Sequence, residues 1–131
     1  MNTDVAVLAE GWISYWLAPP DSALRESSSW AIDREYQLVR DDPEAAWFLI
    51  LEVLRKNCST RILEVLSAGP LEDLLAQHGE RMIAAVEREA KSNALFASLL
   101  GGVWRNAISE EVWSRVQAVW IRTGWDGVTE A

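Results

Sequence analysis

The residues whose types could do acid–base chemistry are His78 and two carboxylates near it, Glu72 and Glu80. An imidazole with neighbouring carboxylates is a set of groups that general acid–base catalysis uses, so an enzyme built on these three residues is one hypothesis. His78 directly precedes Gly79, however, and a histidine at the C-terminal end of a helix is stabilised there by the helix dipole. We therefore favour a capping role and expect no enzyme, unless the three side chains converge in a pocket.

Metal, nucleotide and thiol chemistry have little support in the chain. It holds one histidine and one cysteine, whereas a zinc site takes several such ligands, so we expect no metal and no cofactor. The pair Gly101-Gly102 lacks the spacing of a phosphate-binding loop. Cys58 has no evident base beside it and is interpreted as a structural thiol. A single cysteine forms no internal disulfide, which fits a reducing cytoplasm.

The charge balance restricts the partners. The formal net charge is −8, from 20 acidic and 12 basic residues, so DNA, RNA and anionic lipid should be repelled. A basic protein would be attracted and steered toward such a surface. The other interpretation is that the acidic charge only keeps the protein soluble. No apolar run reaches the ~20 residues of a membrane span, so no membrane association is expected.

The periodicity of the apolar residues predicts an all-α fold. The 131 residues suit one domain, 1–131, of six to eight short antiparallel helices, and stacked helix pairs like an α-solenoid fragment are one arrangement that fits. A helix should run from Asn2 or Thr3 to the stop at Pro19-Pro20. Residues 21–29 read as a loop, and 30–38 as a short helix.

Capping residues predict the later helices. Asp42 followed by Pro43 should start a helix that continues to Lys56 and lies at the centre of the domain. Gly69 should stop one helix and Pro70 should open the next, which should end at Gly79. The remaining starts are expected at Ser59, at Ser92 or Asn93, and at Ser109, and the last helix is expected to end at Gly124. A further amphipathic helix should carry Met82, Ile83, Val86 and Ala90 on its apolar face.

Eight tryptophans are present, far more than usual in a chain of this length. They recur in phase with aliphatic residues, so about three in four should be core. Tryptophan also anchors protein interfaces, and an exposed minority would mark a contact site.

The charged and polar residues at helix starts and joints are the candidate contact groups. Glu72 and Asp73, like Asp41 and Asp42, are best explained by the positive end of a helix dipole, although either pair could also contribute to an acidic docking surface. Arg105 and Asn106 follow Trp104 at a glycine-rich bend. Pairing of Arg105 with a helix-end carboxylate and bonding of Asn106 to open backbone groups are favoured over recognition of an anion or a polar partner contact. The candidate partner-binding residues are Asp41, Asp42, Glu44, Glu72, Asp73, Trp104 and Arg105.

Two local patterns carry a resemblance, AGPLEDLL at residues 68–75 and GGVWRN at residues 101–106. Through them the chain resembles a family of small bacterial all-helical domains of unknown function, over roughly residues 40–125. The resemblance implies a helical fold and brings no catalytic residues. In size and acidity the chain is also similar to bacterial immunity proteins, including those of contact-dependent growth inhibition systems.

These observations favour a non-enzymatic cytoplasmic immunity protein that binds a basic toxin domain, with a nuclease as a plausible target. A helical scaffold or regulatory module with an unrelated protein partner is the alternative. The position of the gene, behind a toxin gene or isolated, would separate the two. Exposed tryptophans would equally suit a homodimer.

Overall fold

The computed structural model describes residues 2–123 and 125, and within them the chain forms helices and no strand. The predicted all-α class is therefore confirmed. No helix in this part of the chain combines the length and apolar character needed to cross a membrane. The elements in order are α1 (Asn2–Leu17), α2 (Ala23–Asp41), α3 (Pro43–Lys56), α4 (Thr60–Leu66), the π-helical turn η1 (Ser67–Leu71), α5 (Glu72–Ser92), α6 (Ala94–Leu100) and α7 (Glu110–Val119).

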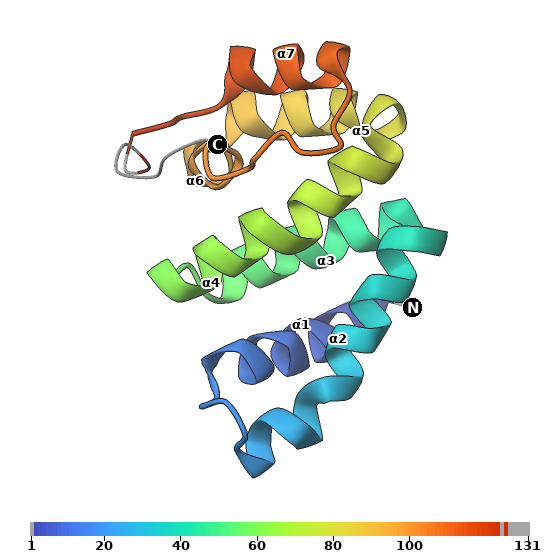
Figure 1. Cartoon of the computed structure of the whole chain (residues 1–131), viewed down its shortest axis with the longest axis vertical. Coiled ribbons are helices and arrows are strands. Elements are labelled where there is room, and N and C mark those ends of the chain that lie inside the picture. Colours follow the sequence, from blue (N-terminus) through green and yellow to red (C-terminus); the bar gives the residue numbers. More distant parts are fainter. Residues whose placement is uncertain (1, 124, 126–131) are drawn as a thin grey trace.

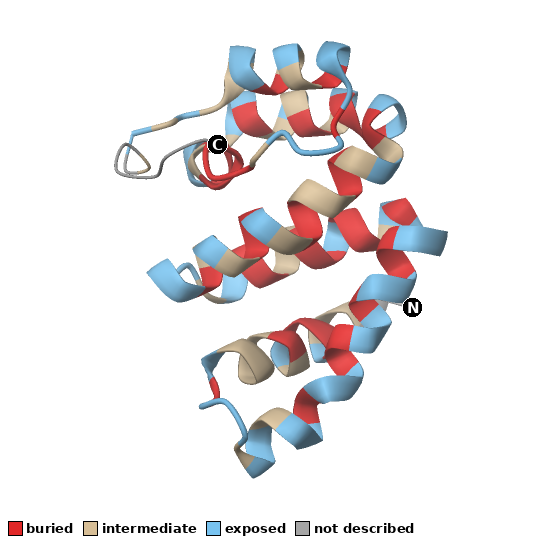
Figure 2. Cartoon of the chain, in the orientation of Figure 1, coloured by how far each residue is buried: buried red, intermediate tan, exposed pale blue. Residues whose placement is uncertain are grey.

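The helices stack in layers along the long axis of the molecule (Figure 1). The hairpin of α1 and α2 forms one end, and α3 with α4 and the first part of α5 forms the middle. The second part of α5 forms the other end with α6 and α7. Buried residues line the faces between the layers (Figure 2), and they join into one hydrophobic core. Burying these faces stabilises the stack, because no single helix can cover its own apolar side.

Side-chain caps set the helix starts that the sequence predicted. The Asp42 carboxylate accepts from the N–H of Ala45 at 3.3 Å, and Pro43 occupies the first turn of α3. Ser59, Asn93 and Ser109 cap α4, α6 and α7 in the same way. Each cap satisfies an N–H that the helix itself leaves open, so these boundaries depend on neighbouring residues alone.

Helix α2 departs from the prediction of a loop over 21–29 and a short helix over 30–38. One helix of 19 residues runs through both segments, capped by Ser22. The serines inside it bond to their own helix: the hydroxyls of Ser27 and Ser29 donate to the carbonyls of Leu24 and Glu26. Packing along α1 therefore outweighs the weak helix propensity of a serine run.

The segment from α4 to α5 is also more continuous than predicted. Gly69 does not adopt a left-handed conformation, and Pro70 lies inside η1 rather than at a helix start. A π-turn widens the helix locally, which accommodates a proline that lacks an N–H and crowds the preceding turn. The break predicted at Gly79 lies one residue earlier: α5 consists of two helical stretches joined by a kink at His78, whose φ is −135° and ψ 30°.

The tryptophans are less buried than expected. Only Trp12 and Trp47 are fully buried, Trp30 is exposed, and the other five are half-buried. Three of those five, Trp16, Trp113 and Trp120, pack against the core from its edge. An indole suits such a position because its ring is apolar while its N–H can reach water or a surface acceptor.

The chain after α7 crosses back over α6. Helix α7 ends at Val119, earlier than predicted, and Gly124 lies outside the described residues. The N–H of Ile121 donates to the carbonyl of Ala97 at 2.9 Å, and the indole of Trp125 donates to the carbonyl of Ser98 at 2.8 Å. Gly101 is needed here, because a Cβ on it would lie 2.0 Å from the carbonyl oxygen of Ile121.

Candidate partner-binding surface

Three of the predicted contact residues, Asp41, Asp42 and Glu44, lie together at the corner between α2 and α3. Asp41 is exposed and pairs with Arg40, which lowers the pKa of the Asp41 carboxyl through a hydrogen bond. Glu44 accepts both N–H groups of Arg81 on α5, each at 2.7 Å. The carboxylates at this corner are therefore already engaged within the protein, two in ion pairs and Asp42 in the cap of α3.

Three other predicted residues, Glu72, Trp104 and Arg105, meet at the bend before α7. One carboxylate oxygen of Glu72 accepts from the backbone N–H of Trp104 at 3.2 Å, and the other accepts from the side chain of Asn106 at 2.5 Å. Arg105 donates to the carbonyl of Ile108 at 3.3 Å, and Asn106 has a left-handed φ of 39°. The bend is thus held by polar groups of the protein itself, but the two expected roles are exchanged: Arg105 bonds a backbone carbonyl and Asn106 bonds a carboxylate.

The last predicted residue, Asp73, is half-buried beside Glu72 and acts on a carboxyl that was not among the predicted residues. That carboxyl belongs to Glu35 on α2, a residue that is only 3% exposed. Its Oε1 accepts from the indole N–H of Trp12 on α1 at 3.4 Å. Its Oε2 is buried without a hydrogen-bond partner among the described residues.

Burial dominates the protonation of this carboxyl. Desolvation raises the pKa of Glu35 to about 7, the bond from Trp12 opposes the rise, and the charge of Asp73 adds to it. The pKa of Asp73 is itself raised by desolvation and by the charge of Glu72. A buried acid is costly to ionise unless a cation faces it, and no ion pair involving Glu35 is found in the described part of the chain.

A groove of about 830 Å³ runs over the outer side of α2, between α1 and the start of α3. Large side chains line it and are open to solvent: Trp30 is 47% exposed, Tyr36 54% and Val7 57%. Volumes of this order hold ligands or anchor side chains, and exposed aromatic residues in a groove are typical of interfaces. This groove is therefore the best-formed candidate for a binding surface.

The polar residues of the groove are two aspartates, two arginines and Gln37. Arg34 donates to Gln37 at 2.7 Å, and Arg40 is paired with Asp41. Asp42 caps α3, whereas Asp33 forms no ion pair among the described residues. The groove thus combines apolar anchors with an acidic group that is available to a partner.

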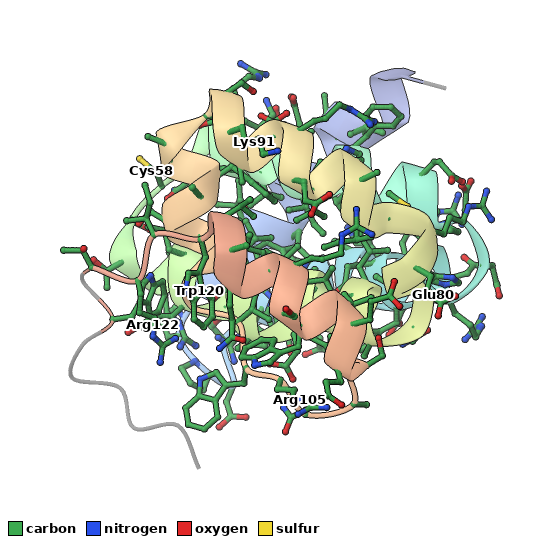
Figure 3. All side chains as sticks on the ribbon, turned by 90° about the horizontal axis from the view of Figure 1, so that it is seen from above. Cys58, Glu80, Lys91, Arg105, Trp120 and Arg122 are labelled. Carbon is green, nitrogen blue, oxygen red and sulfur yellow. The ribbon has the colours of Figure 1, made fainter. Side chains whose placement is uncertain are left out.

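A second, smaller pocket of about 360 Å³ contains two of the three residues considered for catalysis. His78 and Glu80 line it, whereas Glu72 is absent from its lining and is bound to Trp104 and Asn106. Nε2 of His78 donates to the carbonyl of Val39 at 2.7 Å, so its contact is with the end of α2. Glu80 and Arg105 both lie at the rim of the molecule in Figure 3. The three groups do not converge.

Two other sequence interpretations concern metal ligands and the cysteine. Within residues 2–123 and 125, no cluster of three or more histidine, cysteine or acidic side chains has the arrangement of a metal site. Cys58 is exposed rather than packed in the core, and it lies at the edge of the molecule in Figure 3. Its interpretation as a structural thiol therefore finds no support in core packing.

Comparison with protein families gives a match over residues 18–124 to a family of unknown function, DUF6869. The chain belongs to this family. No curated protein and no solved structure is significantly similar to the chain. The DUF6869 match takes in α2 to α7 and so includes Trp30, Glu35 and Tyr36. It begins earlier than the residue 40 that the sequence resemblance suggested.

The DUF6869 region also contains the signal that sequence reasoning missed. In α2 the buried positions are Ser28, Ala31, Ile32, Glu35, Leu38 and Val39. Their spacing is that of one helix face, and an acid stands on it while Trp30 and Tyr36 point outward. Segment 30–38 buries an acid, Glu35, and exposes two aromatic side chains, Trp30 and Tyr36. This reverses the usual preference of acids for the surface and of aromatic residues for the interior. Departures from such preferences are expected at functional sites, so a buried acid beside exposed aromatic residues is the signal that could have identified this one.

Proposed function

We propose that this DUF6869 protein is a non-enzymatic, cytoplasmic immunity protein that binds and neutralises a bacterial toxin domain. The binding surface is the groove lined by α1, α2 and the start of α3. The partner that suits it best is a basic nuclease domain, such as those of contact-dependent growth inhibition systems. The observation that carries the proposal is that α2 exposes Trp30 and Tyr36 in this groove while it buries Glu35.

The apolar part of the groove supports binding to a protein. Exposed tryptophan and tyrosine are the residue types that most often dominate the energy of protein interfaces, because they bury large area with few rotatable bonds. The side chain of Trp30 packs over Gly11, where a Cβ would lie 2.7 Å from its ring. This contact orients the indole before a partner arrives, which reduces the entropy lost on binding.

The charge supports a basic partner. With a net charge of −8, the protein attracts a cationic domain from a distance and raises its association rate. At the groove, Asp33 is available for a lysine or arginine, while Arg34 and Arg40 are held by Gln37 and Asp41. A toxin nuclease has a basic groove for its substrate, so covering that groove would inhibit it by exclusion.

The test is binding to the toxin domain encoded beside the gene, measured by calorimetry at two salt concentrations. We expect Trp30→Ala and Tyr36→Ala each to weaken binding by tenfold or more, roughly the loss of a hot-spot residue. Phe48→Ala is the matched control, because Phe48 is an equally exposed aromatic residue, 58%, that does not line the groove. It should leave the affinity unchanged, and the association rate of the wild type should fall as salt rises.

Two results would overturn the proposal. The first is that no product of a neighbouring toxin gene binds. The second is an affinity that Trp30→Ala and Tyr36→Ala leave as little changed as Phe48→Ala does. Sedimentation of the free protein belongs to the same experiment: a dimer that dissociates with Trp30→Ala would make a second copy of this chain the occupant of the groove.

A further inference from the structure

We propose that Glu35 is a proton-dependent link between α1 and α2: with its carboxyl protonated it holds α1 in place, and with the proton lost it loosens α1 and the wall of the groove that α1 forms. The link itself is a property of the free protein. Its consequence for partner binding rests on the proposed function of the groove.

The geometry places Glu35 directly under α1. Trp12, only 1% exposed, donates its indole N–H to Glu35 across the interface, and the ring of Trp16 lies 6.2 Å from that of Trp12. Two buried polar atoms, Oε2 of Glu35 on α2 and Nε1 of Trp16 on α1, have no partner among the described residues. An interface with unpaired polar atoms is sensitive to charge, because a charge placed there finds little compensation.

The charged groups around Glu35 all favour the protonated form. Helix α5 contributes Asp73, the charge among the described residues that acts on Glu35, with Glu72 next to it. Tyr36 on α2 stays neutral near pH 7, because desolvation and then the charge of Glu35 raise its pKa. Helix α1 faces Glu35 with an indole and carries Tyr15, which acts on Tyr36. From α3 and η1, which also pack on α2, no charged group acts on Glu35 among the described residues.

The cations that contact α1 pair with groups other than Glu35. Lys56 bonds the carboxylate of Glu10 at 3.3 Å. Arg25 donates to the carbonyls of Tyr15 and Ala18, and its guanidinium lies 4.7 Å from the centre of the Tyr15 ring. Arg61 lies over the ring of Trp16 at 5.6 Å. These contacts hold the far end of α1 without neutralising Glu35. When Glu35 ionises, its carboxylate is stabilised only by the long hydrogen bond from Trp12 and is repelled by the charge of Asp73. Separation of α1 from α2 would let water hydrate the carboxylate.

Loosening of α1 would reach the groove because α1 supplies part of its wall. Val5, Val7 and Leu8 of α1 line the groove opposite Trp30 and Tyr36 of α2. Glu35 lies on the buried face of the same segment of α2, one residue before Tyr36. Since burial brings the pKa of Glu35 to about 7, the change falls near neutrality. The partner should therefore bind more tightly at pH 6 than at pH 8.

The test is hydrogen exchange of the α1 amides in the free protein at pH 6 and pH 8, corrected for the intrinsic rates. The α7 amides serve as the internal reference. In the wild type, α1 protection should fall about tenfold or more on going to pH 8, as expected for a shift of a unit or more in a coupled titration. Glu35→Gln should abolish the fall. Asp33→Asn, which neutralises an exposed carboxylate on the same helix, should leave it intact.

Protection of α1 that does not change with pH in the wild type would sink the proposal, as would an unchanged fall in Glu35→Gln. If that variant fails to fold, a ¹³C titration of the wild-type carboxyls decides the matter: a midpoint for Glu35 near its ordinary 4.5 overturns the proposal, and one near 7 supports it. These measurements need no partner. Their outcome is therefore separate from that of Trp30→Ala and Tyr36→Ala, which tests the groove alone.

Discussion

The indole N–H of Trp12 points at Oε1 of Glu35 across the α1–α2 interface, over 3.4 Å, and both side chains are buried. A neutral carboxyl is tolerated there, whereas a carboxylate would lose its hydration in exchange for one long hydrogen bond. Burial of the Glu35 carboxyl, which the bond from Trp12 offsets only in part, should make the stability of the helical hairpin depend on pH.

Stability should fall as pH rises through neutrality. The folded protein keeps a proton on Glu35 up to a pKa of about 7, whereas the unfolded chain loses it near 4.5. The contribution is fully present below pH 4.5 and is lost by the time pH has passed 7. A rise in pKa from 4.5 to about 7 corresponds to about 3 kcal/mol.

Glu35→Gln should remove this dependence. A glutamine stays neutral, so the variant should match the wild type near pH 5 and exceed its free energy of unfolding at pH 8, by up to about 3 kcal/mol. Urea denaturation at both values measures the difference between the two proteins, in which the titration of other carboxyls cancels. A difference that does not change between pH 5 and pH 8 would contradict the assignment.

Asp73→Asn should shift the pH of this transition without removing it. The charge of Asp73 is the smallest of the three causes acting on Glu35, after desolvation and the Trp12 bond, so its removal should lower the pKa of Glu35 only in part. The ¹³C shift of the Glu35 carboxyl gives that pKa directly. Glu80→Gln, on an exposed part of α5, serves as the control and should leave the titration of Glu35 in place.

Much of the fold could be predicted because its signals are local. Asp42, Ser59 and Ser109 cap α3, α4 and α7 through bonds to residues three positions away, and the starts of these three helices were predicted correctly. Helix α2 was missed because its formation depends on packing against α1, which no window of sequence contains. The helix start predicted at Pro70 was wrong for the opposite reason. Proline is a strong local indicator of a helix start, but here a π-turn accommodates it inside a longer helical segment.

The candidate site was harder to predict from the sequence than the fold. The carboxylates at helix starts were recognised, but Glu44 finds its partner in Arg81, 37 residues away, and no sequence spacing reveals that pairing. The spacing of Trp30 from nearby apolar residues suggested a buried position. Only the full extent of α2, Ala23–Asp41, shows that Trp30 lies on the exposed face of the helix. Glu35 was detectable in principle, since it occupies a position of the buried face of α2.

Gly101→Ala should destabilise the protein while Gly69→Ala should not. A Cβ at Gly101 would lie 2.0 Å from the carbonyl oxygen of Ile121, and backbone cannot rotate away as a side chain can. The crossing segment must then move off α6, at a cost of about 1–3 kcal/mol, as in other overpacked sites. Nothing lies within 4 Å of a Cβ at Gly69, which makes it a matched control. Equal urea midpoints for the two variants would refute the close approach.

His78→Ala tests how the kink of α5 is held against α2. Nε2 of His78 donates to the carbonyl of Val39 at 2.7 Å, in the last turn of α2, where carbonyls have no partner within the helix. Removing the donor should cost about 1 kcal/mol, the usual net value of such a bond. Gln77→Ala is the control, because Gln77 is the exposed neighbour and forms no side-chain hydrogen bond among the described residues. If the urea midpoint moved as far with Gln77→Ala as with His78→Ala, the loss would reflect the kink itself rather than the bond that joins it to α2.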